Sequence, residues 1–288
     1  MQHSINDIIM HDMLQNTQQS AANGVRDITI GVAAHKDYPM PQDPMYVPLH
    51  VGAAIHPYKL EGFTGDDTGE NISNLNNYFS ELTGMYWLWK NCNSEYIGLM
   101  HYRRYLASPS FFRRHFSPRD RRMVTEPELK RVLRKESVVL PKKRNYYIDT
   151  IYSQYARTMY AEQLDVARGV LVDMHPDYVA AWDTQMRSRS AHLFNMMVMD
   201  KAHFDAYCEW LFPILFELQK RLDPSQYSAF HARYPGRVSE RLLDVWINTN
   251  HVAYAELPTT SPEPVNWVKK GGSFILSKLT GKKYVSSF

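Results

Sequence analysis

A hydrophobic run that ends in basic side chains carries the strongest chemical signal in this sequence. Residues 96–100 read Tyr-Ile-Gly-Leu-Met, and His101, Arg103 and Arg104 follow directly. The apolar run predicts a buried strand, and charges delivered at its carboxyl end are costly unless an anion meets them. Arginine forks match phosphate geometry in a bidentate manner, so a diphosphate is a candidate ligand. The alternative is pairing with internal acids: Asp66, Asp67 or Glu81.

A second polar group follows the first apolar run of the chain. Residues 27–34 (DITIGVAA) predict a buried strand, and His35, Lys36 and Asp37 come next. In a doubly wound fold this position approaches a nucleotide. We therefore expect His35 and Lys36 to meet a phosphate and Asp37 to accept from a base or ribose. An ordinary polar loop is the alternative.

A Gly-rich loop places adjacent carboxylates within residues 62–73. Asp66 and Asp67 lie there, and Asn71 follows them. Oxygen ligands of this kind suit a divalent cation such as Mn²⁺ or Mg²⁺. Asp and Gly are also ordinary turn residues, so a solvated turn is an equally simple interpretation.

Two acidic residues share one face of a predicted helix over residues 239–250, with Ser239 as its expected cap. Glu240 and Asp244 are four residues apart, which places them on the same side of a helix. A carboxylate facing a sugar pocket could act as a general base on an acceptor hydroxyl, and Trp246 could stack on a sugar. The alternative is helix-surface charge paired with Arg241.

Strands and helices alternate through most of the chain. The pattern predicts strands at 27–34, 51–55, 96–100, 138–141 and 192–199, and helices at 77–91, 125–135, 150–172, 201–222 and 239–250. This alternation favours an α/β sheet with helices on its faces and a helical C-terminal part. Ligands gather at the carboxyl edge of such sheets, so the loops after Ala34, Met100 and Met199 are the expected site.

The composition excludes several classes of protein. The 288 residues are 44% hydrophobic and carry a formal net charge of +3, which is weak for a nucleic-acid-binding protein. Two cysteines, Cys92 and Cys208, form no metal-binding or disulfide pattern and favour a reducing compartment. No signal peptide or membrane-spanning run is visible. We expect a flexible leader over 1–25, a catalytic domain over 26–257 and a basic amphipathic tail over 258–288.

The tail mixes apolar and basic side chains. Residues 266–288 combine Trp267, Phe274 and Leu276 with five lysines. Such a pattern is typical of weak, reversible contact with anionic lipid. A solvated tail or a packing arm is the alternative.

Several segments, taken in order, resemble a known bacterial family. They are residues 69–73 (GENIS), 80–83 (SELT), 86–91 (YWLWKN), 96–105 (YIGLMHYRRY), 140–144 (LPKKR), 192–196 (HLFNM), 207–212 (YCEWLF) and 237–246 (RVSERLLDVW). The family was long labelled a domain of unknown function in capsular and exopolysaccharide gene clusters. A related domain is the galactofuranosyltransferase half of bifunctional O-antigen polymerases. The resemblance runs from about Ile28 to about Glu256.

The resemblance implies a GT-A-like fold and a glycosyltransferase that uses a nucleotide sugar, UDP-galactofuranose or UDP-galactose. It implies a glycan or lipid-linked glycan acceptor and a cytoplasmic location, peripheral at the inner face of the membrane. GT-A enzymes usually carry an Asp-x-Asp metal motif where this chain has His101-Tyr102-Arg103. We therefore expect cationic side chains to replace the metal, with Asp66 and Asp67 as the alternative metal site.

The site residues expected on this basis fall into three groups. Glu240, or secondly Asp244, is the base of an inverting transfer. His192, Asn195 and Trp246 line the acceptor side. The donor side comprises His35, Lys36, Asp66, Asp67, Asn71, His101, Arg103 and Arg104. The competing functions are a non-catalytic anion- or nucleic-acid-binding module built on residues 113–122 and a degenerate transferase scaffold. The low net charge disfavours nucleic acid.

Overall fold

A seven-stranded mixed sheet forms the centre of the molecule. The structure, a computed structural model, describes residues 28–263. The sheet has the order β10-β6-β9-β4-β1-β2-β3, and β9 alone runs antiparallel to its neighbours. Its strands are β1 (Ile28–Ala34), β2 (Tyr46–His50), β3 (Thr64–Gly65), β4 (Tyr96–His101), β6 (Val138–Pro141), β9 (Met197–Asp200) and β10 (Ala255–Leu257).

Two short strand pairs form separate two-stranded sheets. In one, β5 (Tyr105–Leu106) pairs with β11 (Thr259–Thr260), and in the other β7 (Arg144–Asn145) pairs with β8 (Ser190–Ala191). The first pair continues directly from β4. It therefore fixes the path of the chain beyond the basic residues His101 to Arg104.

Alternation along the strands divides the core into two layers. In β4, Ile97 and Leu99 join one buried cluster, whereas Tyr96 and Met100 join the cluster on the opposite face. Successive strand side chains point to opposite faces, so both faces of this sheet are covered. Gly31 in β1 permits close packing against this layer, because a Cβ there would lie 2.5 Å from Leu49 and 2.8 Å from Leu88.

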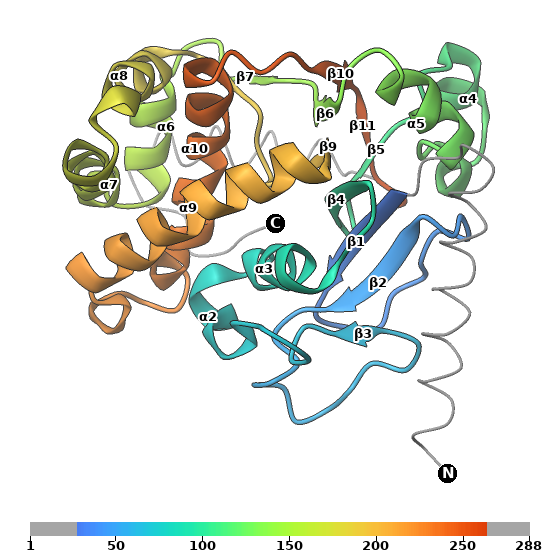
Figure 1. Cartoon of the computed structure of the whole chain (residues 1–288), viewed down its shortest axis with the longest axis horizontal. Helices are drawn as coiled ribbons and strands as arrows, with labels where there is room; N and C mark the ends of the chain where they lie inside the picture. The colour runs from blue at the N-terminus through green and yellow to red at the C-terminus, as the bar shows by residue number, and fades with distance from the viewer. Residues whose placement is uncertain (1–27, 264–288) are drawn as a thin grey trace.

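Most of the helical mass lies in the C-terminal half. The helices are α2 (Asn76–Phe79), α3 (Leu82–Asn91), α4 (Phe111–Phe116), α5 (Glu126–Leu133), α6 (Ile151–Thr158), α7 (Ala161–Met174), α8 (Val179–Arg187), α9 (Lys201–Arg221) and α10 (Tyr234–Thr249). Figure 1 shows α6, α7, α8 and α10 gathered at the left, and α4 and α5 at the upper right. The predicted α/β class, a GT-A-like mixed sheet flanked by helices with a helical C-terminal part, is confirmed.

Two helices predicted as continuous are interrupted. The segment 77–91 is divided between α2 and α3 at Ser80, which has a positive φ of 52°. The Asn76 amide braces the break by donating to the carbonyl of Ser80 and the hydroxyl of Thr83. The segment 150–172 divides into α6 and α7, where the Thr158 hydroxyl donates to carbonyls of the last turn of α6. Apolar periodicity continues across both breaks, so the sequence pattern missed them.

Three further predictions of local structure were wrong. Residues 51–55 form turns rather than a strand, and the preceding residues, including Pro48, form β2. Residues 192–196 are a loop with positive φ at Phe194 and Asn195, so β9 begins only at Met197. Helix α10 begins at Tyr234, so Ser239 lies inside it and is no cap. Apolar composition alone cannot separate a buried loop from a strand.

The predicted domain limits lie close to the ends of the described region. Strand β11, at Thr259–Thr260, pairs with β5 just beyond the predicted boundary at residue 257. The predicted leader over 1–25 and the predicted lipid-binding segment over 266–288 lie outside the described residues. Across residues 28–263, none of the helices combines the length and apolar character needed to cross a bilayer.

Candidate active site

Parallel pairing brings two of the predicted basic groups together. Strands β1 and β4 are parallel neighbours, with Ala33 opposite His101. The ring of Tyr102 lies between the two strand ends: His35 contacts it edge-on at 5.5 Å, and the charged groups of Lys36 and Arg103 lie 5.5 and 5.1 Å from its centroid. Three of the predicted donor-binding residues thus surround one buried ring at the carboxyl edge of the sheet.

Arg104 is half-buried and carries no paired acid. Its guanidinium lies 3.6 Å from the centroid of the Phe194 ring, and within residues 28–263 neither it nor Arg103 forms an ion pair. Burial lowers the pKa of Arg104; Glu240 and Glu81 act in the opposite direction, and Arg144 and Arg103 reinforce the lowering. The alternative in which these arginines are neutralised by Asp66, Asp67 or Glu81 is therefore not supported.

Arg233 is a further basic residue near His35. Burial lowers the pKa of His35, and the charges of Lys36, Arg233, His56 and Arg103 lower it further. Arg233 immediately precedes α10. Cationic side chains therefore come here from three elements: Lys36 after β1, Arg103 after β4 and Arg233 before α10.

The loop over residues 192–196 connects the end of β4 to α10. The ring Nε2 of His101 lies 2.6 Å from the carbonyl oxygen of Phe194. The Asn195 amide donates to Glu81 at 2.7 Å and to the carbonyl of Gly236 at 3.1 Å, and its oxygen accepts from Ser239. Asn195 is almost fully buried. It positions this loop rather than lining an open acceptor surface as predicted.

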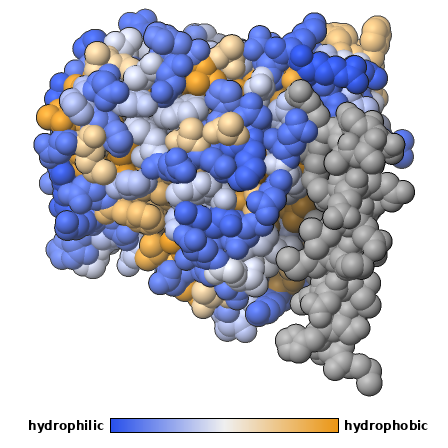
Figure 2. Space-filling view, in the orientation of Figure 1, coloured by the Kyte–Doolittle hydropathy of each residue, from blue (hydrophilic) through white to orange (hydrophobic). Residues whose placement is uncertain are grey.

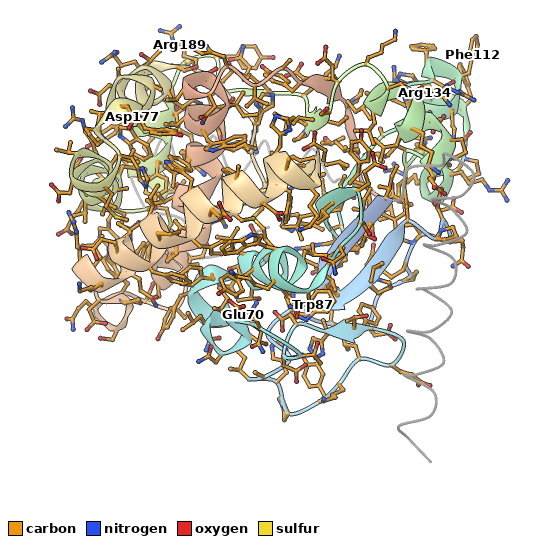
Figure 3. All side chains as sticks on the ribbon, in the orientation of Figure 1. Glu70, Trp87, Phe112, Arg134, Asp177 and Arg189 are labelled. Carbon is orange, nitrogen blue, oxygen red and sulfur yellow. The ribbon has the colours of Figure 1, made fainter. Side chains whose placement is uncertain are left out.

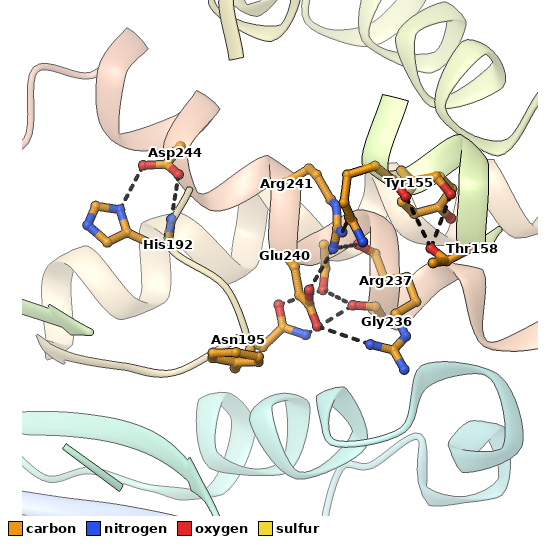
Figure 4. A network of polar contacts seen from close by, with 12 residues as sticks. Tyr155, Thr158, His192, Asn195, Gly236, Arg237, Glu240, Arg241 and Asp244 are labelled. Atoms are coloured by element: carbon orange, nitrogen blue, oxygen red, sulfur yellow. Dashed lines mark hydrogen bonds and ion pairs between the residues drawn. The ribbon is translucent and has the colours of Figure 1, made fainter. Parts of the chain in front are cut away.

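Glu240 lies in the first half of α10, surrounded by arginines (Figure 4). Its side chain is buried, with Oε2 2.6 Å from Arg241 Nη1 and Oε1 3.8 Å from Arg237 Nη1. The predicted pairing with Arg241 is therefore real. The charges of Glu240 and Glu81 act against the lowering of the pKa of Arg104. Both carboxylates thus act electrostatically on the basic strand end.

Asp244 belongs to a buried network behind this site. Its oxygens accept from the ring Nδ1 and the backbone N–H of His192 at 2.7 and 2.8 Å, and from Gln185 at 3.2 Å. Lys143 forms an ion pair with it at 3.3 Å. With an exposed fraction of 1%, the carboxylate is closed off from solvent. Its contacts are those of a residue that ties α10 to the loop before β9.

His192 and Trp246, both predicted on the acceptor side, are also buried. The second ring nitrogen of His192 lies 2.9 Å from Glu256 on β10, so the imidazole bridges two carboxylates. Trp246 is 4% exposed and its ring packs against Tyr207 at a centroid distance of 5.3 Å. The helix pattern could not reveal this burial, because nearly the whole circumference of α10 is covered.

Replacing Asp244 by Asn should lower stability and flatten its dependence on pH. Burial alone would raise the pKa of Asp244, but the hydrogen bond and charge of His192 and the charge of Lys143 hold it below its ordinary value. The stabilisation is therefore present above the unfolded pKa and is lost as pH falls through the folded one. We expect Asp244→Asn to cost about 3–5 kcal/mol near neutral pH.

Urea unfolding at a series of pH values between about 6 and 3 checks this expectation. The difference between the two proteins should shrink as the solution becomes more acidic. Asp177→Asn, at an exposed position, is the control and should follow the unmodified chain. A difference that stays constant with pH would contradict the argument.

The acidic side chains of the loop after β3 bond to groups of the protein itself, chiefly to the backbone. The Asp66 carboxylate is fully buried and accepts from the backbone N–H groups of Gly52 and Ala53 and from the hydroxyl of Ser73. Asp67 pairs with Lys59 at 3.7 Å, and the Asn71 side chain bonds within its own loop. These residues do not fit a divalent cation. In the described part of the chain, no group of three or more His, Cys, Asp or Glu side chains could hold a metal ion.

Several residues near the site escaped the sequence argument. Arg144 follows β6 in the same way that Arg103 follows β4, so the rule of basic residues after a strand could have found it. Arg233 left no signal, because it reaches the end of β1 only through the packing of α10. His50, at the end of β2, lies 2.9 Å from His56, and both rings are nearly parallel to that of Tyr58.

A pocket of about 310 Å³ lies elsewhere, among α6, α7 and α8. Its charged lining is internally satisfied, because Arg168 makes two hydrogen bonds to Asp183 and Tyr152 donates to Asp165. None of the basic residues at the strand ends lines it. The geometry therefore favours the carboxyl edge of the sheet as the functional site.

Comparison with known proteins identifies the family of the chain. The chain is similar to a solved structure described as the apo form of the WbbM bifunctional glycosyltransferase, with 30% identity and a TM-score of 0.75. The similarity covers 82% of this chain but 45% of that one, so the chain spans about half of its solved neighbour. A search of curated proteins found no match. The family model described as "Domain of unknown function (DUF4422)" matches residues 29–251, and the chain belongs to this family.

Proposed function

We propose that this chain is a glycosyltransferase that moves a sugar from a UDP-sugar to a growing bacterial surface polysaccharide. The observation that carries the proposal is Arg104, a half-buried guanidinium without a paired acid beside His101 and Arg103. Leaving such a charge uncompensated is unfavourable. A diphosphate at the strand ends would compensate it, and nucleotide sugars carry that group. The similarity to a bifunctional glycosyltransferase supports the same reaction class.

The proposed donor is UDP-galactofuranose or UDP-galactose. The support is the resemblance of residues 96–105 and their neighbours to the galactofuranosyltransferase half of bifunctional polymerases. Because the chain corresponds to about half of its solved neighbour, it would catalyse one transfer. The acceptor would be a glycan or a lipid-linked glycan at the cytoplasmic face of the membrane.

The proposed mechanism is direct displacement at the anomeric carbon. An acceptor oxygen forms the new bond to that carbon as the bond to the diphosphate oxygen breaks, and UDP leaves with the electron pair. Arg103, Arg104 and Lys36 would neutralise the charge that develops on the leaving group, and the imidazoles of His35 and His101 would donate hydrogen bonds to it. Fixed donors of this kind supply a large share of catalysis.

Glu240 would take the proton of the acceptor hydroxyl. It lies within electrostatic reach of Arg104, whereas Asp244 is enclosed by His192, Gln185 and Lys143. A single base acting on one displacement implies inversion of configuration. The two buried residues His192 and Asn195 would act by positioning the loop that carries Phe194 against Arg104.

Transfer should survive exhaustive chelation. The reason is that Asp66 is committed to backbone N–H groups and Ser73, while cationic side chains occupy the position next to the strand end. Product formation from UDP-sugar, measured after treatment with a chelator, checks the expectation. A complete loss of activity that Mn²⁺ or Mg²⁺ restores would show that a cation is required.

A thermal-shift screen tests the proposed function itself. A ligand that binds only the folded state raises the melting temperature by mass action, by an amount set by its concentration relative to Kd. UDP and UDP-sugars should raise it, whereas uridine, which lacks phosphate, should not. Stabilisation by RNA with no effect of any UDP-sugar would instead favour an anion-binding module.

A further inference from the structure

Helix α4 presents a contiguous aromatic surface to solvent. Phe111, Phe112 and Phe116 are 58%, 74% and 75% exposed. Their rings adjoin one another: the centroids of Phe111 and Phe112, and of Phe112 and Phe116, are 6.0 Å apart, and Phe111 packs on His115 at 4.4 Å. Single exposed apolar residues are ordinary, but a continuous patch of this kind marks an interaction site.

Arginines surround this aromatic surface. Residues 113–122 contain five, of which Arg113 pairs with Glu128 on α5 at 2.9 Å. Within residues 28–263 the other four form no ion pair: Arg114, Arg119, Arg121 and Arg122. Asp120 is the one acid in residues 113–122. Four cations less one acid leave a local charge of +3 beside the phenylalanines. Figure 2 shows pale orange side chains projecting next to strongly hydrophilic ones at the upper right.

The surface is held rigidly in place. Arg114 donates to the carbonyls of Ser108 and Pro109 at 2.7 Å each, and Arg122 donates to that of Ser117 at 2.8 Å. Arg113 donates to the carbonyl of Arg121 at 2.7 Å and anchors α4 to α5 through Glu128. The aromatic rings are thus exposed on a braced element. These hydrogen bonds hold the rings outside the core.

We propose that α4 and the arginines of residues 113–122, the α4 patch, dock the protein on an anionic lipid bilayer. Aromatic rings favour the boundary between headgroups and acyl chains, and adjacent arginines attract anionic headgroups. Charge complementarity selects this occupant: a second copy of the chain would bring the same positive patch against itself. Aromatic rings beside arginines also stack on the bases of single-stranded nucleic acid, but the formal net charge of +3 disfavours that partner.

The patch is connected directly to the candidate active site. Phe111 follows Arg104 by seven residues, and only β5 and a short turn separate them. Figure 3 shows Phe112 at the extreme upper right of the molecule, beyond Arg134 of the neighbouring segment. Docking through α4 would hold the strand ends close to the bilayer. If the proposed transferase function is correct, a lipid-linked acceptor would be presented there.

Vesicle co-sedimentation of the full chain tests the α4 patch. The vesicles are phosphatidylcholine alone, or equal parts of phosphatidylcholine and phosphatidylglycerol. We expect binding to the anionic vesicles and a loss of about tenfold or more in affinity when Phe111, Phe112 and Phe116 are all replaced by Ser. Arg119→Gln with Arg121→Gln should weaken binding to anionic vesicles and reduce its sensitivity to salt.

The matched control replaces exposed apolar residues on another helix. Val172 and Met174 of α7 are 44% and 39% exposed, and α7 lies at the opposite side of the molecule in Figure 1. Their replacement by Ser should leave vesicle binding unchanged. Because the α4 phenylalanines contact solvent, their variant should keep the melting temperature and hydrolyse soluble UDP-sugar normally.

Three results would overturn the proposal. They are unchanged vesicle binding by the Phe-to-Ser variant, equal binding to neutral and anionic vesicles, or no vesicle binding combined with α4-dependent self-association or RNA binding. None of these results bears on the transferase proposal, because UDP-sugar hydrolysis is measured without lipid. Conversely, lipid binding through α4 would stand even if the chain proved inactive towards UDP-sugars.

Discussion

Replacing Arg104 by Ala is expected to lower kcat/KM for a UDP-sugar by about 100- to 1,000-fold, the loss typical of one fixed donor to developing charge. The guanidinium lies on the Phe194 ring at the end of β4, and no acid in the described region forms an ion pair with it. The charge that forms on a departing diphosphate would be its natural partner. Steady-state transfer and UDP-dependent thermal shift should both reveal the loss.

Arg104→Lys distinguishes charge from geometry. Lysine keeps the positive charge but loses the planar fork and the stacking on Phe194. We expect it to recover only part of the activity. Arg134→Ala, at an exposed position after α5, is the matched control and should behave like the unmodified chain.

The stability of the Arg104→Ala variant gives an independent readout. Removing a half-buried cation that has no paired acid should leave the melting temperature of the ligand-free protein equal or raise it. The rise caused by UDP should shrink at the same time. An active variant with an unchanged UDP response would remove Arg104 from the donor site. So would a crystal structure in which UDP binds far from Arg103 and Arg104.

The second large effect is expected for Glu240→Gln, which should lower kcat by about 100- to 10,000-fold while UDP still binds. The amide keeps the shape of the side chain but cannot accept the proton of an acceptor hydroxyl. Transfer to acceptor and the UDP thermal shift, measured on the same preparation, separate the two roles.

Structural damage must be distinguished in this case, because Glu240 is buried and paired with Arg241 and Arg237. Breaking a buried pair can destabilise the fold. A melting temperature and UDP shift close to those of the unmodified chain would show that α10 is intact. Glu209→Gln, on the exposed side of α9, is the control. Retained turnover in Glu240→Gln would exclude this residue as the base.

Much of the sheet was predictable because each buried strand is a short run of apolar residues in the sequence. The apolar runs at 28–34, 96–100 and 138–141 each became a strand, and the alternation of β4 between two core clusters follows directly from that pattern. The rule that ligands gather at carboxyl ends then predicted that the residues after these strands meet, as His35, Lys36 and Arg103 do around Tyr102. Parallel pairing of β1 with β4 is what brings them together.

The sequence alone determined which charged residues end the strands, since that depends on residue order and strand polarity. It could not determine which partners each carboxylate has. Asp66, Asp244 and Glu240 look alike in a sequence, yet backbone N–H groups hold the first and His192 holds the second. Only the tertiary packing of α10 against the loop at 192–196 places the third near Arg104. Burial and hydrogen-bond partners arise from contacts between distant segments, and local patterns do not encode them.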